Sequence, residues 1–379
     1  MSAAIRLWLP DGVASEEQEE DISVADAVKQ YGEAKRLAPR TRAEYGTMLS
    51  KLYAWSAASK HRLRTPMLLG DLTAERLPEF LDWVEENAGG ENKANSRNKC
   101  LAMLGAVIRW AFDQELLPSM PRLPKSVEAR DVAGQYFFTD GEIDSIYWAT
   151  YKLKSPRGWD LAQPLGAYWR TAIVLFRTYG MDTQALFPYA SATECVLRWK
   201  HCTSESLPPG RVALVENQAG FLTIKREKTG RTRIVPLDAV VRSHLDLIRP
   251  AAADPDWPIM GRGHGPKGVC TAAGGVRPCL RFKTLCESGN VPKKLDVESG
   301  EIRDHELKDL RKTCGTMHDA NVPETGVRML GHSTGTVTDR HYSHTLPAMI
   351  AAMKTFKHPR AFYSLLDESI RPPELLFAK

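Results

Sequence analysis

Long apolar runs, export signals and patterned cysteines are all missing from this 379-residue chain. No apolar stretch approaches the ~18 residues that a membrane-spanning helix needs. The N-terminus lacks the basic start, apolar stretch and small-residue cleavage site of an exported protein. The seven cysteines show no C-x-x-C spacing, which favours reduced thiols over a disulfide framework. We therefore expect a cytoplasmic protein.

The composition excludes several broad structural classes. Hydrophobic residues make up 43% of the chain and charged residues 26%, a balance that argues against wholesale disorder, collagen and coiled coil. The net charge of +5 hides an asymmetry, because residues 1–21 carry −5 and the rest of the chain therefore carries +10. Such a surplus suits a polyanionic partner, although many enzymes that never bind nucleic acid carry as much.

Helical periodicity dominates the first third of the chain. After an acidic tail (residues 1–21) that we expect to be disordered, Ser23 is a candidate N-cap for a first helix. Three further segments place apolar residues three and four positions apart, which indicates amphipathic helices. They span residues 41–57, 73–87 and 94–114. These patterns predict an all-α domain over residues 22–118.

A proline-containing stretch, residues 116–134, separates this domain from the rest, and we place the linker at residues 119–134. The second domain, predicted over residues 135–345, begins with Thr139 and Glu142 in the spacing of a capping box. A strongly apolar helix is expected to end at Gly180.

The only clear β signal lies between residues 211 and 237, where apolar and polar residues alternate around turn-forming residues. This pattern predicts a short antiparallel ribbon. A C-terminal helix and tail follow at residues 346–379. The fold class we expect is mainly α with a small antiparallel β ribbon.

Several common site types find no support in the sequence. No Gly-rich phosphate loop ends in Lys-Ser or Lys-Thr, and no dinucleotide-binding fingerprint follows a strand pattern. Cys314 and His318 lie four residues apart on a predicted helix, but two further metal ligands at suitable spacing are missing. We interpret them as a buried thiol and a surface histidine, and we expect no metal.

The segment from residue 305 to 344 is the most informative, because it gathers Lys308, Arg311, His332, His341 and Tyr342. It resembles the active-site region of the tyrosine recombinase (phage integrase) family. In that family a histidine or lysine begins a D-L-R-x-T helix, to which the run K-D-L-R-K-T from Lys308 is similar. The family's L-G-H, followed about ten residues later by a tyrosine, resembles Leu330-Gly331-His332 and Tyr342 in order and spacing.

Two upstream segments extend the resemblance. The run K-T-G-R-T-R-I-V-P-L, which begins at Lys228, is similar to the family's β-hairpin lysine motif. Thr41 and Tyr45 match the T-x-x-x-Y opening of the family's helical core-binding domain. The resemblance therefore implies an N-terminal helical core-binding domain and a C-terminal α+β catalytic domain of tyrosine recombinase type.

The resemblance also implies a chemistry. Tyr342 would attack a DNA phosphate and form a phosphotyrosyl ester, which a DNA hydroxyl later reverses. Arg311 and His332 would hold the phosphate, because guanidinium and imidazole donors stabilise its developing negative charge. Lys308 would be a proton acceptor or auxiliary cation, and Lys228 would protonate the leaving 5′ oxygen. No metal or nucleotide cofactor is implied.

The sequence departs from the family at its first arginine, which lies in a segment similar to t-G-l-R-x-x-E. Asp182 stands where that arginine is expected. The aspartate removes a bidentate donor and adds a negative charge near a phosphate, and the loss of one preorganised donor costs about 10²–10³ in rate. We therefore hypothesise that this sequence cleaves DNA weakly or not at all while it keeps the DNA-binding architecture.

Neighbouring arginines do not obviously compensate. Arg177 is out of phase on the same helix and Arg170 lies twelve residues away from Asp182, so neither should reach the same point. Alternatively, another arginine could occupy the space through an altered loop. A guanidinium beside Arg311 in the structure would support that alternative.

Basic residues of the N-terminal domain are candidate contacts to DNA phosphates, and a solvated basic face is the alternative for any one of them. They lie around the junction of the first two helices and along the fourth helix: Lys35, Arg36, Arg40, Arg42, Lys93, Arg97, Lys99 and Arg109. Two domains joined by the linker would close around double-stranded DNA.

The segment 346–366 is apolar on one side and is expected to be helical up to Pro359. In the family such helices dock onto a neighbouring protomer, so the resemblance implies a homo-oligomer assembled on DNA. Packing within its own chain is the alternative.

Three functions follow from these observations. The first is a tyrosine-type site-specific recombinase or integrase. The second is a catalytically disabled homologue that binds DNA as an accessory or regulatory protein, which Asp182 favours. The third is an enzyme similar to type IB topoisomerases, which share the tyrosine chemistry.

Overall fold

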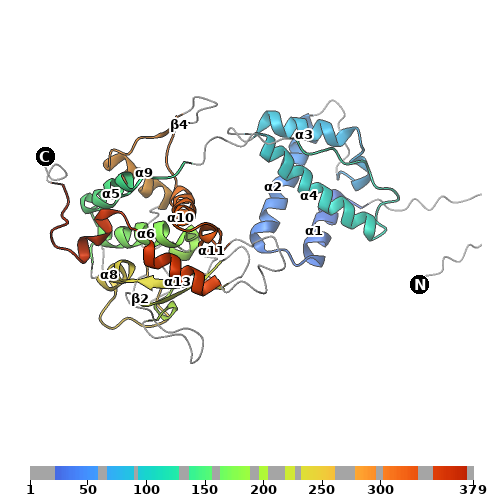
Figure 1. Cartoon of the computed structure of the whole chain (residues 1–379). Coiled ribbons are helices and arrows are strands. Elements are labelled where there is room, and N and C mark those ends of the chain that lie inside the picture. Colours follow the sequence, from blue (N-terminus) through green and yellow to red (C-terminus); the bar gives the residue numbers. More distant parts are fainter. Residues whose placement is uncertain are drawn as a thin grey trace, which may run out of the picture. The chain divides into compact units, whose positions relative to one another are not determined.

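The computed structural model describes residues 22–58, 66–88, 93–127, 136–155, 163–187, 196–203, 218–226, 232–260, 278–295, 302–331 and 345–373. The chain forms two compact units, which divide between Ala133 and Gly134 (Figure 1). Within the described ranges, none of the helices is both long and apolar enough to cross a bilayer.

The N-terminal unit is helical, as the periodicity predicts. Its elements are α1 (Val24–Ala34), α2 (Pro39–Ala58), the 3-10 turn η1 (Leu69–Asp71), α3 (Arg76–Asn87) and α4 (Lys93–Asp113). Ser23 caps α1, because its Oγ accepts a hydrogen bond from the Asp26 amide at 3.1 Å. The apolar faces of the helices meet in one core, in which Leu52, Phe80 and Ile108 are fully buried.

Part of the segment that we expected to be a linker packs on this unit. Leu117 is buried in the core, and Leu123 packs against it. The Asn98 side chain of α4 donates to the Val127 carbonyl at 2.7 Å and accepts from the Val127 amide at 3.0 Å. Residues 119–127 therefore lie against the N-terminal unit. The Asn98 side chain holds the end of this segment, because it satisfies both backbone groups of Val127.

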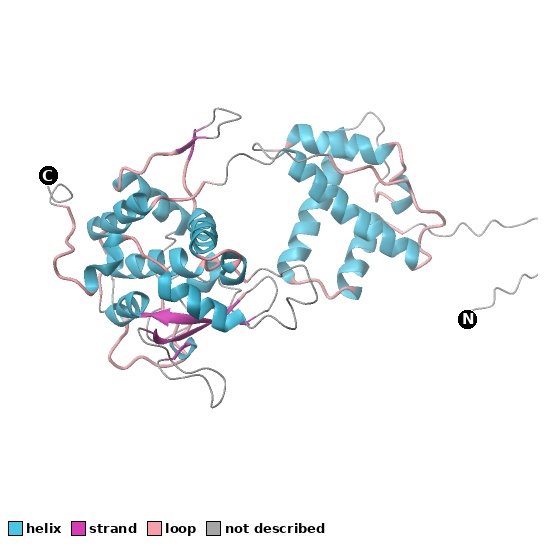
Figure 2. Ribbon diagram, in the orientation of Figure 1, coloured by secondary structure: helices cyan, strands magenta, loops and turns pink. Residues whose placement is uncertain are grey.

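The C-terminal unit combines helices with small antiparallel sheets (Figure 2). In chain order its elements are α5 (Asp140–Ala149), η2 (Thr150–Lys152), α6 (Leu165–Tyr179), α7 (Thr183–Leu186), η3 (Trp199–His201), β1 (Cys202–Thr203), β2 (Gln218–Lys225), β3 (Thr232–Asp238), α8 (Ala239–Ile248), α9 (Pro278–Ser288), β4 (Lys294–Leu295), β5 (Ile302–Arg303), α10 (Leu307–Asn321), α11 (Thr325–Met329), α13 (Thr345–Thr355) and η4 (Arg360–Leu365).

Helix α6 is the centre of the C-terminal unit. Every one of its residues is buried, as its strongly apolar sequence predicts, and α8 and α10 pack against it. Helix α5 begins at the expected capping box, in which Thr139 and Glu142 bond reciprocally. The expected β ribbon forms as β2 and β3, with Leu222 opposite Val235, and β1 extends the sheet in the order β1-β2-β3.

The C-terminal segment packs on its own chain over the described residues 345–373. Helix α13 lies against β3 and α11, and the Asn321 side chain of α10 donates to the Ala352 carbonyl at 2.9 Å. Beyond α13, the His358 Nε2 atom lies 2.6 Å from an Asp238 carboxylate oxygen, and the Phe362 side chain is fully buried. In this chain the segment is therefore part of the core of the C-terminal unit.

Two buried histidines hold that segment in place. The His244 Nε2 atom lies 2.8 Å from the Tyr147 hydroxyl, which in turn lies 3.0 Å from the Ser364 Oγ atom. His318 stacks on Phe356 with ring centroids 4.1 Å apart. We expected His318 at the surface, and this was wrong, because its side chain is buried beneath the C-terminal segment.

The free energy of unfolding should fall between about pH 6.5 and pH 4 because of these histidines. Burial lowers the pKa of His244 and of His318 to about 4. The unfolded chain therefore takes up protons at a higher pH than the folded chain, and stability that is present above about pH 6.5 is lost below it. Each histidine should contribute a slope of about 1.4 kcal/mol per pH unit.

Urea unfolding followed by circular dichroism across this window would measure the slope. In His244→Gln the side chain still forms hydrogen bonds but does not titrate, so the slope should be shallower by one histidine's share whatever the variant's absolute stability. Parallel pH profiles for the variant and the natural chain would contradict this assignment.

Candidate active site

Arg311 projects from the first half of α10, whose N-terminus is firmly anchored. The buried Asp309 carboxylate accepts hydrogen bonds from the Glu306 amide at 2.8 Å and from the Lys294 Nζ at 2.7 Å. Thr313, on the next turn, accepts a hydrogen bond from the Phe138 amide at 2.9 Å. These contacts fix the rotation of α10 and therefore the direction in which Arg311 points.

The guanidinium of Arg311 reaches the end of α6. Its Nη1 donates to the Gly180 carbonyl and lies 3.3 Å from Asp182 Oδ1, while its Nη2 donates to the Leu330 carbonyl at 2.8 Å. Gly180 ends α6 with φ +53°, the left-handed conformation that glycine adopts without strain. A Cβ atom at this position would overlap the Leu330 side chain, so glycine also permits the close approach of these segments.

Close packing of α10 and α11 brings the Leu330-Gly331 segment to the same point. A Cβ atom at Gly315 would lie 3.0 Å from the Leu330 side chain, and one at Gly326 would overlap the Gly315 carbonyl. The two glycines therefore allow α11 to lie directly on α10. The backbone carbonyl of Leu330 then faces the Arg311 guanidinium.

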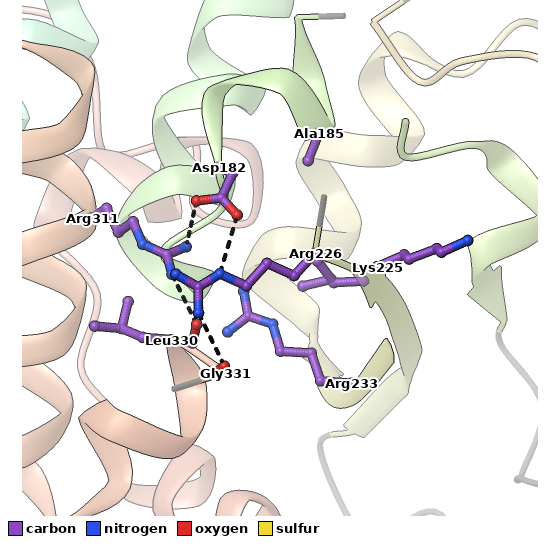
Figure 3. A pocket seen from close by; sticks show the side chains of 9 residues that line it. Asp182, Ala185, Lys225, Arg226, Arg233, Arg311, Leu330 and Gly331 are labelled. Carbon is purple, nitrogen blue, oxygen red and sulfur yellow. Dashed lines mark hydrogen bonds and ion pairs between the residues drawn. The ribbon is translucent and has the colours of Figure 1, made fainter. Parts of the chain in front are cut away.

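The β2–β3 ribbon contributes two more arginines to this place (Figure 3). Arg226, directly after β2, has its Nε 3.6 Å from Asp182 Oδ2 and donates from Nη1 to the Gly331 carbonyl at 3.3 Å. Arg233, on β3, donates from Nη2 to the Tyr179 carbonyl at 2.7 Å. Three guanidiniums from separate elements thus lie at one place, and two of them, those of Arg226 and Arg311, contact the Asp182 carboxylate. We call Arg226, Arg233, Arg311 and Asp182 the arginine cluster.

The arginine cluster lines a small cavity of about 30 Å³ and carries a net charge of +2. Burial lowers the pKa of Arg311; nearby Asp182 opposes the shift and Arg226 adds to it. Burial lowers the pKa of Arg233 to about 10, which still leaves this side chain protonated at neutral pH. The cluster is therefore a cationic site that suits a phosphate group.

The residues expected from the sequence are only partly placed by the structure. Lys228, His332 and Tyr342 lie outside the described residues, although the described chain ends two residues before Lys228 and one before His332. Lys308 is 64% exposed, forms an ion pair with Glu306 and does not line the cavity.

Arg177 and Arg170 do not reach Asp182, as we predicted. Arg177 pairs with Asp140 at 3.3 Å, and the Arg170 guanidinium lies 4.0 Å from the centroid of the Tyr151 ring.

Sequence reasoning did not single out Arg226 and Arg233, which the structure places beside Arg311. Only the alternative of an arginine from elsewhere in the chain allowed for them. A usable signal was present, because both residues flank the connection between the two strands of the predicted ribbon, next to the candidate lysine. The sequence alone does not show that this end meets the C-terminus of α6.

The basic residues of the N-terminal unit fall into different environments. Those with exposed side chains are Lys35, Arg36, Arg42, Lys93, Lys99 and Arg109, and the Arg40 side chain lies outside the described residues. Lys99 pairs with Glu44 at 3.2 Å. Arg97 was expected to face DNA, but it is buried and forms ion pairs with Asp82 at 3.3 Å and Glu85 at 3.4 Å. Its charge is therefore engaged inside the unit.

Cys314 and His318 share a structural contact. The Cys314 thiol donates to the Thr178 carbonyl at 3.3 Å, and His318 Nε2 lies 2.8 Å from the same oxygen. Over the part of the chain that the structure describes, no group of three His, Cys, Asp or Glu side chains is placed to hold a metal ion. Both residues instead satisfy a carbonyl near the end of α6.

Substitution of Gly180 should test how strongly the cluster depends on the end of α6. We expect Gly180→Ala to lower the free energy of unfolding by about 2–4 kcal/mol, because it adds left-handed strain and a clash with Leu330. Gly141→Ala is the matched control, since a Cβ atom there would have nothing within 4 Å. The control should be neutral or stabilising by up to about 1 kcal/mol. Urea unfolding of both variants measures the difference, and equal effects would contradict the packing argument.

Comparison with known proteins finds similar folds among solved structures. No family model matches the sequence, and no curated protein matches it either. Among solved structures, a lambda integrase dimer bound to a COC′ core site matches with a TM-score of 0.55 and 15% identity, over 83% of this chain and 97% of that one.

Two further structures match similarly. The Tn1549 transposon integrase in complex with circular intermediate DNA has a TM-score of 0.51 and 14% identity, over 88% of this chain and 99% of that one. The XerH site-specific recombinase bound to palindromic difH substrate has a TM-score of 0.52 and 14% identity, over 87% and 83%. The chain therefore has the fold of the tyrosine recombinases.

Proposed function

We propose that this chain is a tyrosine-type site-specific recombinase that cuts and rejoins double-stranded DNA through a 3′-phosphotyrosyl intermediate. The observation that carries the proposal is the arginine cluster, in which Arg311 lies beside the residues that precede Lys228 and His332. The fold is that of enzymes solved in complex with DNA, including a lambda integrase tetramer bound to a Holliday junction.

The proposed reaction assigns each residue one step. The Tyr342 hydroxyl attacks the phosphorus, and the bond from phosphorus to the 5′ oxygen breaks as the tyrosyl ester forms. Lys228 gives a proton to the leaving 5′ oxygen, and a DNA 5′ hydroxyl later reverses the step. Arg311 and His332 stabilise the charge on the non-bridging oxygens. Lys308, on the same helix as Arg311, accepts the proton that the Tyr342 hydroxyl loses as it attacks. The reaction conserves the energy of the phosphodiester as an ester.

A second candidate is a disabled homologue that binds DNA as an accessory or regulatory protein. Asp182 favours this candidate, because a carboxylate occupies the place of an expected guanidinium. Against it stands the surplus of positive charge around that carboxylate, which two arginines contact within 3.6 Å.

Trapping of a covalent adduct separates the two candidates. On a nicked suicide substrate, cleavage releases the short fragment that carries the 5′ hydroxyl, so the strand cannot be rejoined. A protein–DNA adduct that survives denaturing electrophoresis should therefore accumulate. Tyr342→Phe should abolish this adduct while DNA retention stays within about twofold, since the hydroxyl is the only group removed. Retention of DNA without adduct in the natural chain would favour the accessory protein.

DNA binding by the N-terminal unit forms a separate part of the proposal. Exposed cations such as Lys35 and Arg36 would contact phosphates and release counterions. Assembly of a homo-oligomer on DNA would follow from two such chains binding one recombination site.

Salt dependence should distinguish exposed from engaged arginines. Arg36→Gln should reduce the slope of log affinity against log salt by about 0.9 if it removes one phosphate contact. Arg97→Gln should leave that slope unchanged but lower the free energy of unfolding by about 1–2 kcal/mol, because Arg97 forms ion pairs within the unit. Fluorescence anisotropy on duplex DNA at several salt concentrations, with urea unfolding in parallel, measures both. An unchanged slope in Arg36→Gln would remove this residue from the interface.

A further inference from the structure

The arginine cluster contains a carboxylate that behaves like a bound anion. Arg311 Nη1 and Arg226 Nε contact different oxygens of Asp182, at 3.3 Å and 3.6 Å (Figure 3). Two guanidiniums that share the two oxygens of one carboxylate have the arrangement that binds two oxygens of a phosphate. Asp182 therefore marks the place between Arg226 and Arg311 where an anion is stabilised.

Asp182 is held there weakly. Its side chain is 37% exposed, and it makes no capping hydrogen bond to α7, which it precedes. Within the described residues the Asp182 side chain contacts only the two arginines, and the longer of the two contacts exceeds hydrogen-bond distance. A rotation about its side-chain bonds would move the carboxylate into solvent without a change in the backbone.

The surrounding arginines have hydrogen-bonding capacity left over. Arg226 Nε and Arg233 Nη1 are buried and have no hydrogen-bond partner among the described residues. Buried donors without partners are costly, so a site that keeps two of them is suited to a ligand that accepts from both. Arg233 is tied to the Tyr179 carbonyl at 2.7 Å and supports the cluster from β3. Arg226 faces the carboxylate directly.

We propose that Arg226 supplies, from the end of β2, the phosphate-binding guanidinium that position 182 lacks, and that Asp182 is a resident anion that the DNA phosphate displaces. This inference rests on the proposed recombinase function. On this view Asp182 does not disable the site. The arginine has instead changed position, because the guanidinium comes from the ribbon and not from the end of α6. In the absence of DNA, Asp182 reduces the repulsion between Arg226 and Arg311.

An exchange of the arginine between the two positions tests the inference. On the nicked suicide substrate, Arg226→Gln should slow adduct formation by about 10²–10³-fold, the effect of losing one preorganised donor. The double variant Asp182→Arg with Arg226→Gln should recover to within about tenfold of Asp182→Arg alone. An arginine with a merely structural role would not be replaced from position 182. A natural rate in Arg226→Gln, or a loss without recovery, would overturn the inference.

Arg242→Gln is the matched control. Arg242 has the same 24% side-chain exposure as Arg226 and also pairs with an aspartate, Asp246, but it lies on α8 outside the cluster. The Arg242→Gln variant should form the adduct at the same rate as the natural chain. Arg226→Lys provides a second variant in case Arg226→Gln unfolds, and it should be slower than the natural chain because lysine cannot form two parallel bonds.

A binding measurement keeps the inference testable if the natural chain forms no adduct. Inorganic phosphate is then titrated into the full chain and followed by phosphorus NMR. Asp182→Asn should raise the affinity for phosphate about tenfold, because it removes the competing charge, and Arg226→Gln should lower it by a similar factor. These changes without any adduct would refute the recombinase but support the phosphate site. An affinity that neither variant changes would overturn the inference, whatever the outcome of cleavage.

Discussion

One guanidinium holds the candidate site together. Arg311 donates to the carbonyls of Gly180 and Leu330 and pairs with Asp182, so it joins α10 to the end of α6 and to the end of α11. Its planar fork cannot satisfy these partners unless all three segments keep their places. The site is therefore ordered when the chain folds, and little reorganisation is needed when an anion binds.

Electrostatics explains why the arginines tolerate one another. Three guanidiniums in a partly buried pocket repel, and burial adds a cost for each charge. Backbone carbonyls of Tyr179, Gly180, Leu330 and Gly331 offset this cost, because each accepts a hydrogen bond from an arginine of the cluster. The carboxylate of Asp182 offsets more of it. The backbone carbonyls thus stabilise a site with a positive electrostatic potential.

Local signals in the sequence were sufficient for most elements but not for the composition of the site. The caps at Ser23 and Thr139 and the end of α6 at Gly180 are marked by neighbouring residues, and all three were predicted correctly. Arg226 could not be assigned, because its role depends on the meeting of the ribbon with the end of α6, segments that are remote in sequence. His318 was misplaced for the same reason, since Phe356 covers it from the C-terminal segment.

The pairing of β2 with β3 determines where sequence change can be absorbed. Ile224 lies opposite Arg233, and Lys225 lies opposite Thr232, so the strand register places Arg233 on a definite side of the sheet. A residue inserted within either strand would turn the following side chains to the opposite face. Extra residues between the strands would add only a loop-closure cost that grows with the logarithm of length. The connection between the strands can therefore vary in length while the positions of Arg226 and Arg233 stay the same.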